Sequence, residues 1–292
     1  MYDLSMSEVP GYDPEKQADS FDTKFEESSE TIKLPDRQID IVDIKPEYPK
    51  SDIPVLIAPG YAETTEIFKG STQIIYEEDR EVIALNHPRH IDKRMSSADI
   101  SDSEEAELPQ VALDRATDLL DIIESKNLDK VDVIAHSQGG IDVAIAASIQ
   151  PEKFRNIVFV DPGGMIGQDT LPRLLGRFSK KMIHDSYLQR KEGLKYMAEN
   201  PARALKEGIA ISQAEIDQML LDLKASGIGI IIIHGVDDPV FPMERVQQVA
   251  ETEMLDGFLS VKGEHDELHK NPAQYTKAAE EMITALEKKE TK

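Results

Sequence analysis

Five short segments of almost uninterrupted apolar residues recur along this chain, and they limit the folds open to it. The segments are IPVLIAPG (53–60), REVIALN (80–86), VDVIAHS (131–137), NIVFVD (156–161) and IGIIIIHG (228–235). Strands of parallel sheets have this composition, because helices bury both of their faces. Two intervening stretches, 108–127 and 140–154, have apolar residues at helical spacings of three and four. The alternation predicts an α/β fold with a mostly parallel, doubly wound sheet.

Two further patterns extend this sheet. The segments ETIKLP (30–35) and RQIDIVDI (37–44) alternate apolar with polar residues around a Pro-Asp-Arg break. This alternation is typical of half-buried strands, and it predicts an antiparallel pair. The segment GFLSVKG (257–263) reads as a last short strand, and a helical pattern follows it from Pro272.

The regular rhythm is interrupted in two places. Residues 1–29 are rich in Asp, Glu, Ser and Pro, with Phe21 and Phe25 as apolar anchors, and are expected to form an extended or partly disordered acidic arm. Residues 162–226 show helical patterns but no strand, which predicts an inserted helical cap. The sheet-forming core would then comprise residues 30–161 and 227–292.

Charge and composition exclude several classes of function. The 292 residues carry a formal net charge of −23, which disfavours nucleic acid and anionic lipid headgroups as partners. The absence of cysteine excludes disulfides and thiolate chemistry. No signal-peptide pattern begins the chain and no apolar run reaches about 18 residues, so we expect a cytoplasmic protein without an integral membrane segment.

Ser137 stands where the third apolar run passes into a helical pattern. A serine in a tight turn at this point projects its Oγ above the sheet edge, at the N-terminus of the helix. The residues two before and two after it must be small, and they are Ala135 and Gly139. A helix-capping or packing serine is the alternative interpretation of this stretch alone.

An acid and a histidine follow at the expected ends of later strands. Asp238 lies in the loop after the run that ends at Gly235, at the sheet edge where catalytic groups gather, although an aspartate before proline also favours a turn and Asp237 competes for the role. His265 lies in the loop after the last short strand, with His269 as its local rival. A loop histidine can accept the proton of Ser137 while an aspartate fixes its tautomer.

The order Ser137, Asp238, His265 resembles that of the α/β-hydrolase superfamily, in particular its serine esterases and lipases with a helical cap. The resemblance spans about residues 30–290. It implies an oxyanion hole made by the backbone N–H groups of Tyr61 and Gln138. The loop APGYAET has Pro59-Gly60 where the family often has His-Gly, and the nucleophile motif begins with Ala135 where Gly is common. A minority of the family keeps its acid at the position of Asp161, which is therefore the second candidate.

Other residues fit weaker hypotheses. His136, His87, Pro59 and Gly60 are candidates to line a substrate pocket, and His136 alternatively packs or hydrogen-bonds within the turn. His87 and His90 lie three residues apart, but no third histidine stands beside them, so we expect no metal. The resemblance to serine esterases and lipases implies that no cofactor is needed.

These residues together predict a serine hydrolase that cleaves carboxylic esters of small-molecule substrates. The aliphatic cap and the acidic surface favour small to medium, neutral, apolar esters. An amidase, thioesterase, lactonase or acyltransferase would use the same triad, and a non-catalytic ligand-binding protein could retain the same fold. A third hypothesis is that the acidic arm and residues 96–107 dock a basic partner.

Overall fold

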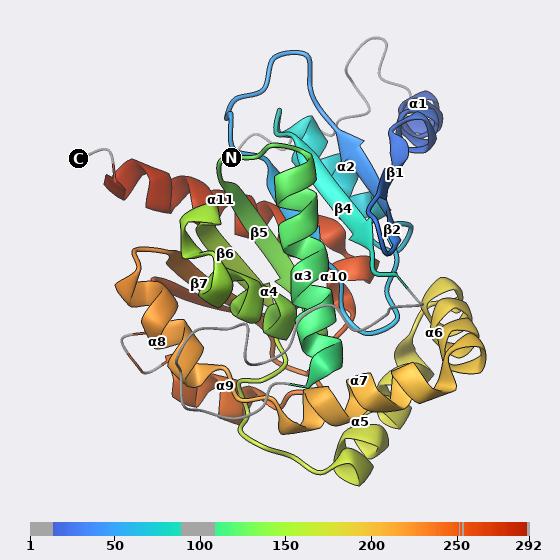
Figure 1. The fold of residues 1–292 in the computed structure, drawn as a ribbon, viewed down its shortest axis with the longest axis vertical. Coiled ribbons are helices and arrows are strands. Elements are labelled where there is room, and N and C mark those ends of the chain that lie inside the picture. The colour runs from blue at the N-terminus through green and yellow to red at the C-terminus, as the bar shows by residue number, and fades with distance from the viewer. Residues whose placement is uncertain (1–13, 89–108, 251, 253, 291–292) are drawn as a thin grey trace, which may run out of the picture.

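The computed structural model describes residues 14–88, 109–250, 252 and 254–290, and its centre is an eight-stranded sheet (Figure 1). The strand order is β1-β2-β4-β3-β5-β6-β7-β8. The strands are β1 (Ser29–Lys33), β2 (Gln38–Ile44), β3 (Val55–Ala58), β4 (Val82–Asn86), β5 (Val131–His136), β6 (Phe154–Val160), β7 (Gly229–Gly235) and β8 (Gly257–Val261). Pairs β1–β2 and β2–β4 are antiparallel, and the remaining pairs are parallel. The predicted α/β fold with a mostly parallel, doubly wound sheet is confirmed.

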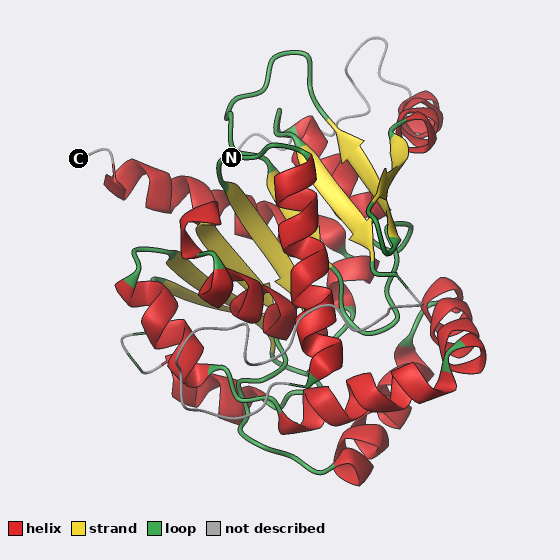
Figure 2. Ribbon diagram, in the orientation of Figure 1, coloured by secondary structure: helices red, strands yellow, loops and turns green. Residues whose placement is uncertain are grey.

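Helices cover both faces of the sheet, as Figure 2 shows. The helices are α1 (Pro14–Glu27), α2 (Lys69–Glu77), α3 (Gln110–Ser125), α4 (Gln138–Ile149), α5 (Leu171–His184), α6 (Tyr187–Glu199), α7 (Pro201–Gln213), α8 (Asp217–Ala225), α9 (Met243–Ala250), α10 (Glu267–Lys270) and α11 (Pro272–Glu290). Successive residues of β6 face the two helical layers on opposite sides of the sheet. Ile157 packs in a hydrophobic cluster with α3 and α4, while Val158 packs in a second cluster with α2 and α11. Both faces are therefore apolar, as the continuous runs require.

Boundaries differ from the sequence prediction where proline intervenes. The stretch 140–154 was expected to be helical throughout, but α4 ends at Ile149 and a short 3₁₀ turn covers Pro151–Lys153. Proline lacks an N–H and cannot continue the ladder of helical hydrogen bonds, so the chain turns there and β6 begins at Phe154. Helices α2 and α9 were not predicted.

The N-terminal segment corrects the expectation of an extended arm. Residues 14–27 form α1, and residues 1–13 lie outside the described part of the chain. Phe21 and Phe25 are buried, because their spacing of four places both rings on one side of the helix. The ring of Phe21 lies 6.1 Å from that of Tyr76 on α2. The acidic segment 96–107, the other proposed docking segment, also lies outside the described residues.

Four helices lie between β6 and β7, within the range predicted to form a cap. Helix α8 packs against α4 and β7, so it belongs with the layers that cover the sheet. Helix α7 packs against α5 and α6, and it also contacts α3. Figure 1 places these three beyond the ends toward which the arrows of the parallel strands point. The domain boundaries themselves remain a prediction.

No helix in the described ranges is long and apolar enough to cross a membrane.

Candidate active site

Ser137 lies in a strained turn between β5 and α4. Its backbone angles are φ 53° and ψ −118°, in the left-handed region that side chains other than glycine rarely adopt. The turn is held by its N–H, which donates to the carbonyl of Val160 at 3.0 Å. A Cβ on Gly139 would lie 2.3 Å from the carbonyl oxygen of Ala58, which explains why this position needs glycine. Sheet packing therefore imposes the geometry that exposes Oγ at the start of a helix.

The three residues predicted from loop positions meet at this turn. The Nε2 of His265 lies 2.9 Å from Oγ of Ser137, and its Nδ1 lies 2.8 Å from Oδ2 of Asp238. These atoms form one continuous hydrogen-bonded chain from carboxylate to hydroxyl. Such a chain can accept the hydroxyl proton while the oxygen acts as a nucleophile.

The orientation of Asp238 is fixed from its other oxygen. Oδ1 accepts the backbone N–H groups of Val240 at 2.6 Å and Phe241 at 3.0 Å. Oδ2 is thereby directed at His265, whose ring lies 5.3 Å from that of Phe241. Asp237, the rival acid, is exposed.

Asp161, the second candidate acid, has a different set of partners. It follows β6, and its Oδ1 accepts the N–H of Gly235 at 2.7 Å. Burial, with the charge of Asp238 added, raises the pKa of Asp161 well above its ordinary value. The structure therefore pairs His265 with Asp238 and leaves Asp161 as a buried neighbour.

The two backbone segments predicted to form an oxyanion hole both lie next to Ser137. Gln138 is the first residue of α4, where a backbone N–H has no intrahelical partner and lies at the positive end of the helix dipole. A Cβ on Gly60 would lie 2.9 Å from the Cβ of Ser137, so the loop that carries Tyr61 touches the serine. The ring of Tyr61 is 5.9 Å from that of Phe178 on α5 and 5.5 Å from that of Tyr196 on α6. The inserted helices thus hold the loop in place.

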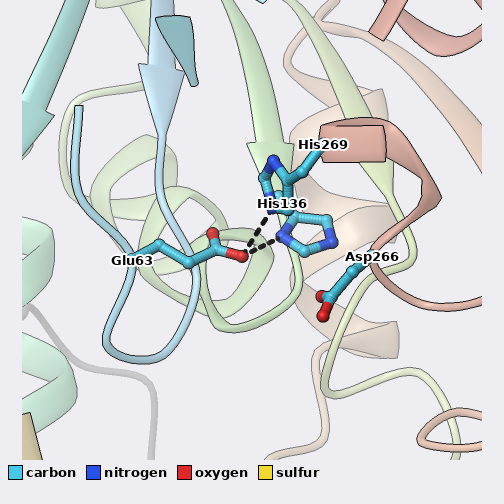
Figure 3. Close-up of side chains that lie close together, drawn as sticks. All are labelled: Glu63, His136, Asp266 and His269. Atoms are coloured by element: carbon cyan, nitrogen blue, oxygen red, sulfur yellow. Dashed lines mark hydrogen bonds and ion pairs between the residues drawn. The ribbon is translucent and has the colours of Figure 1, made fainter. Parts of the chain in front are cut away.

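A buried glutamate behind the turn was missed at the sequence level. Figure 3 shows Glu63 reaching from the loop after β3 toward the rings of His136 and His269. Its Oε1 is 2.8 Å from Nδ1 of His136 and 2.8 Å from Nε2 of His269, and its Oε2 accepts the N–H of Gly60. His136 is fully buried and packs behind the turn, which is one of its two predicted roles. Glu63 stands in a polar loop, and no pattern around it signals burial.

His87 lies beside a polar cavity of about 440 Å³ lined by Arg37, Arg115, Arg203 and Glu207. Its Nδ1 is 2.9 Å from Oδ2 of Asp118. Burial, followed by the charge of Arg115, lowers the pKa of His87 to about 4, so the ring is neutral. His90 lies outside the described residues.

Arg115 on α3 hydrogen-bonds to Pro59 and Gly60, which are the two remaining candidates for pocket lining. Its Nη2 donates to the carbonyl oxygens of Pro59 at 2.8 Å and Gly60 at 3.3 Å. The guanidinium therefore supports the loop before Tyr61 from the direction of α3.

A second cavity of about 250 Å³ lies between this loop and the inserted helices. Tyr61 and Ala62 line one side, and the other side is mainly apolar, with Leu171, Leu174, Leu175, Phe178, Met182, Met197, Leu205 and Ile211 among its residues. Ser137 is 3% exposed and His265 is 1% exposed. Neither residue lines either of these two cavities.

Two groups of described residues bring oxygen and nitrogen atoms close enough to hold a metal ion: Glu63, His136, Asp266 and His269, and separately Asp161, His234 and Asp238. In the first group, hydrogen bonds already join Glu63 to both imidazoles, and Asp266 pairs with Lys181 at 2.7 Å. In the second, Asp238 is directed at His265. Protein contacts therefore already engage part of each group.

Comparisons with known proteins find the same fold. A family model described as the α/β hydrolase fold matches residues 53–185. A search of curated protein sequences finds no match. A solved structure of a bacterial membrane phospholipase A has a TM-score of 0.68 at 15% identity, covering 94% of this chain and 92% of its own.

Two solved structures from studies of esterases have similar TM-scores and sequence identities. A structure from work on carboxylesterases of Nitrososphaera gargenis has a TM-score of 0.63 at 17% identity, covering 89% of this chain and 100% of its own. A thermophilic esterase from Thermogutta terrifontis has a TM-score of 0.64 at 15% identity, covering 88% and 98%. At such low identities, these similarities show a shared fold.

Proposed function

The chain belongs to the α/β-hydrolase superfamily, and we propose that it is a serine hydrolase that cleaves carboxylic esters through an acyl-enzyme on Ser137. One observation carries the proposal: the unbroken hydrogen-bonded chain from Asp238 through His265 to Oγ of Ser137. The strained turn at Ser137 supports it, because strain of this kind is concentrated at functional sites.

The geometry suggests the following sequence of steps. Oγ of Ser137 attacks the acyl carbon while Nε2 of His265 takes its proton, and the amides of Tyr61 and Gln138 stabilise the resulting oxyanion. The intermediate expels the alcohol, which takes the proton from His265. Water then attacks the acyl-enzyme and gives a proton to His265. That proton returns to Oγ as the carboxylic acid leaves.

The cavity between the Tyr61 loop and helices α5–α7 supports a substrate with a small to medium apolar group. Its volume of about 250 Å³ suits a short acyl or alcohol chain, and apolar side chains make up most of its lining, although Lys181 and Arg190 also line it. The net charge of −23 also disfavours anionic substrates. Helices α5–α7 would then act as the cap that encloses the substrate.

Steady-state kinetics on a series of neutral p-nitrophenyl esters, from acetate to dodecanoate, tests this proposal. We expect saturable hydrolysis with the highest kcat/KM below the longest chains, and slower turnover of matched anilides and thioesters. Higher turnover of the anilide or thioester would reassign the reaction to the amidase or thioesterase alternative. Ester binding without turnover would favour a non-catalytic binding protein.

Replacing Gly193 by leucine should shorten the preferred acyl chain. Gly193 lines the cavity, and a Cβ there meets no atom within 4 Å, so the larger side chain enters the space without disturbing α6. The ratio of kcat/KM for octanoate over acetate should fall about tenfold, since each excluded methylene contributes about 0.8 kcal/mol. Gly176→Leu on α5 is the matched control, because Gly176 also has open space around it but does not line the cavity. Equal ratios in the two variants would place the acyl chain elsewhere.

A further inference from the structure

Glu63 receives hydrogen bonds from three segments that carry different parts of the proposed site. Gly60 belongs to the loop of Tyr61, His136 precedes Ser137, and His269 stands four residues after His265. The Glu63 side chain is only 9% exposed, and those of His136 and His269 are 0% and 4% exposed. A single buried carboxylate thus joins the oxyanion loop, the nucleophile turn and the histidine loop.

Both nitrogens of His136 face acceptors. Nδ1 lies 2.8 Å from Glu63, and Nε2 lies 2.9 Å from the backbone carbonyl oxygen of His265. A neutral imidazole carries one N–H and can satisfy only one of these contacts, whereas an imidazolium donates to both. The hydrogen-bond pattern therefore requires the charged form of His136.

We propose that Glu63 is a positioning residue that keeps His136 as an imidazolium and, through His136 and His269, holds the three catalytic segments together. The proposal rests on the hydrolase function proposed above. His136 donates directly to the backbone of His265, so its charge state affects where the catalytic imidazole sits. The hydrogen bond to Gly60 holds the chain immediately before the N–H of Tyr61.

The charged groups around His136 support this protonation state. Burial opposes the charge, but the charge and hydrogen bond of Glu63 raise the pKa of His136 to about 9, and Asp266 and Asp161 contribute in the same direction. The rings of His265, His269 and Phe68 also pack against it, at 5.0, 4.8 and 6.2 Å. Lys181 on α5 is paired with Asp266 on the far side.

Burial would raise the pKa of Glu63, but the charges and hydrogen bonds of His136 and His269 lower it well below its ordinary value. Glu63 therefore stays ionised opposite the imidazolium.

The sign of the pH dependence follows from linkage. The pKa of His136 is raised by folding from 6.5 to about 9. Its contribution to stability is therefore fully present below 6.5 and is lost as the pH rises through about 9. Alkaline pH should weaken the contact to the carbonyl of His265 over the same range.

The test is a pH titration of His136 in the wild-type protein and in Glu63→Gln. The protonation of its ring is monitored by ¹⁵N–¹H NMR. The wild-type ring should remain doubly protonated at neutral pH and titrate near 9. The amide introduced by Glu63→Gln carries no charge, so the midpoint should fall by at least about one pH unit in the variant. A neutral His136 in the wild type at neutral pH, or an unchanged midpoint in the variant, would overturn the proposal.

The same variants separate positioning from folding. Glu63→Gln should lower kcat/KM about 100-fold through misplacement of the catalytic groups, and Glu63→Asp should restore part of it because the charge returns. Glu280→Gln is the matched control, since Glu280 is also buried and paired with a buried cation, Arg80, among residues outside the site. An equal loss of kcat/KM in the control would mean that Glu63 is only structural.

The NMR readout needs no turnover. If the protein hydrolyses no ester but His136 titrates as expected, the proposed function fails while the role of Glu63 in holding His136 charged stands. If Glu63→Gln does not fold, the wild-type titration and Glu63→Asp still decide the proposal.

Discussion

Ser137→Ala should lower kcat/KM for the best p-nitrophenyl ester by about 10⁴-fold or more, leaving only the contribution of binding and the oxyanion donors. The hydroxyl is the one group in the chain of hydrogen bonds that can form the acyl-enzyme. Its loss also leaves Nε2 of His265 without the partner that it contacts at 2.9 Å. The measurement is steady-state hydrolysis at neutral pH, with the thermal unfolding of both proteins recorded to show that the variant is folded.

Ser148→Ala provides the control for this substitution. Ser148 lies on the same helix, α4, and its Oγ donates to the carbonyl of Ala144 at 2.8 Å, away from the turn. We expect near wild-type activity from it. A fully active Ser137→Ala variant would show that Ser137 is not the nucleophile, whatever the activity of the control.

Asp238→Asn should lower kcat by about 10⁴-fold, the size of effect expected when the catalytic histidine is forced into the wrong tautomer. Two backbone N–H groups, those of Val240 and Phe241, hold one oxygen of this side chain. In the variant the amide oxygen takes that position, and the NH₂ group then faces Nδ1 of His265. The imidazole must accept at Nδ1 and carry its proton on Nε2, where it cannot take the proton of Ser137.

Two neighbouring aspartates test whether this effect is specific. Asp237→Asn should have little effect, because its side chain is exposed. Asp161→Asn should also have a small effect, since burial already favours the neutral acid that asparagine resembles. A larger loss in Asp161→Asn than in Asp238→Asn would exchange their assigned roles.

The sequence was most informative where buried strands impose a pattern. The five continuous apolar runs became β3 to β7, and the alternating segments around Pro35 became the antiparallel pair β1 and β2. The site followed from the same rule, because parallel strands end at one edge of the sheet and their loops converge there. For that reason alone, the proximity of Ser137, Asp238 and His265 could be predicted from the sequence.

Features that depend on tertiary contacts were harder to predict. Glu63 looks like a surface residue in a polar loop, and only the packing of His136 and His269 around it creates its burial. Most residues of helix α1 are polar, so the sequence did not predict that the helix forms and buries its two phenylalanines. Sequence periodicity reports which face of an element is apolar, but it does not report which charged groups meet inside the fold.

Ser137 is the activated nucleophile of the proposed reaction, and treatment of the intact protein with a fluorophosphonate probe tests this role most directly. Peptide mass spectrometry should locate a single adduct on Ser137, and replacement of His265 by alanine should abolish it, because Nε2 of His265 is the base that contacts Oγ. Labelling at another residue, or labelling of Ser137 that persists without His265, would contradict the proposed roles of Ser137 and His265.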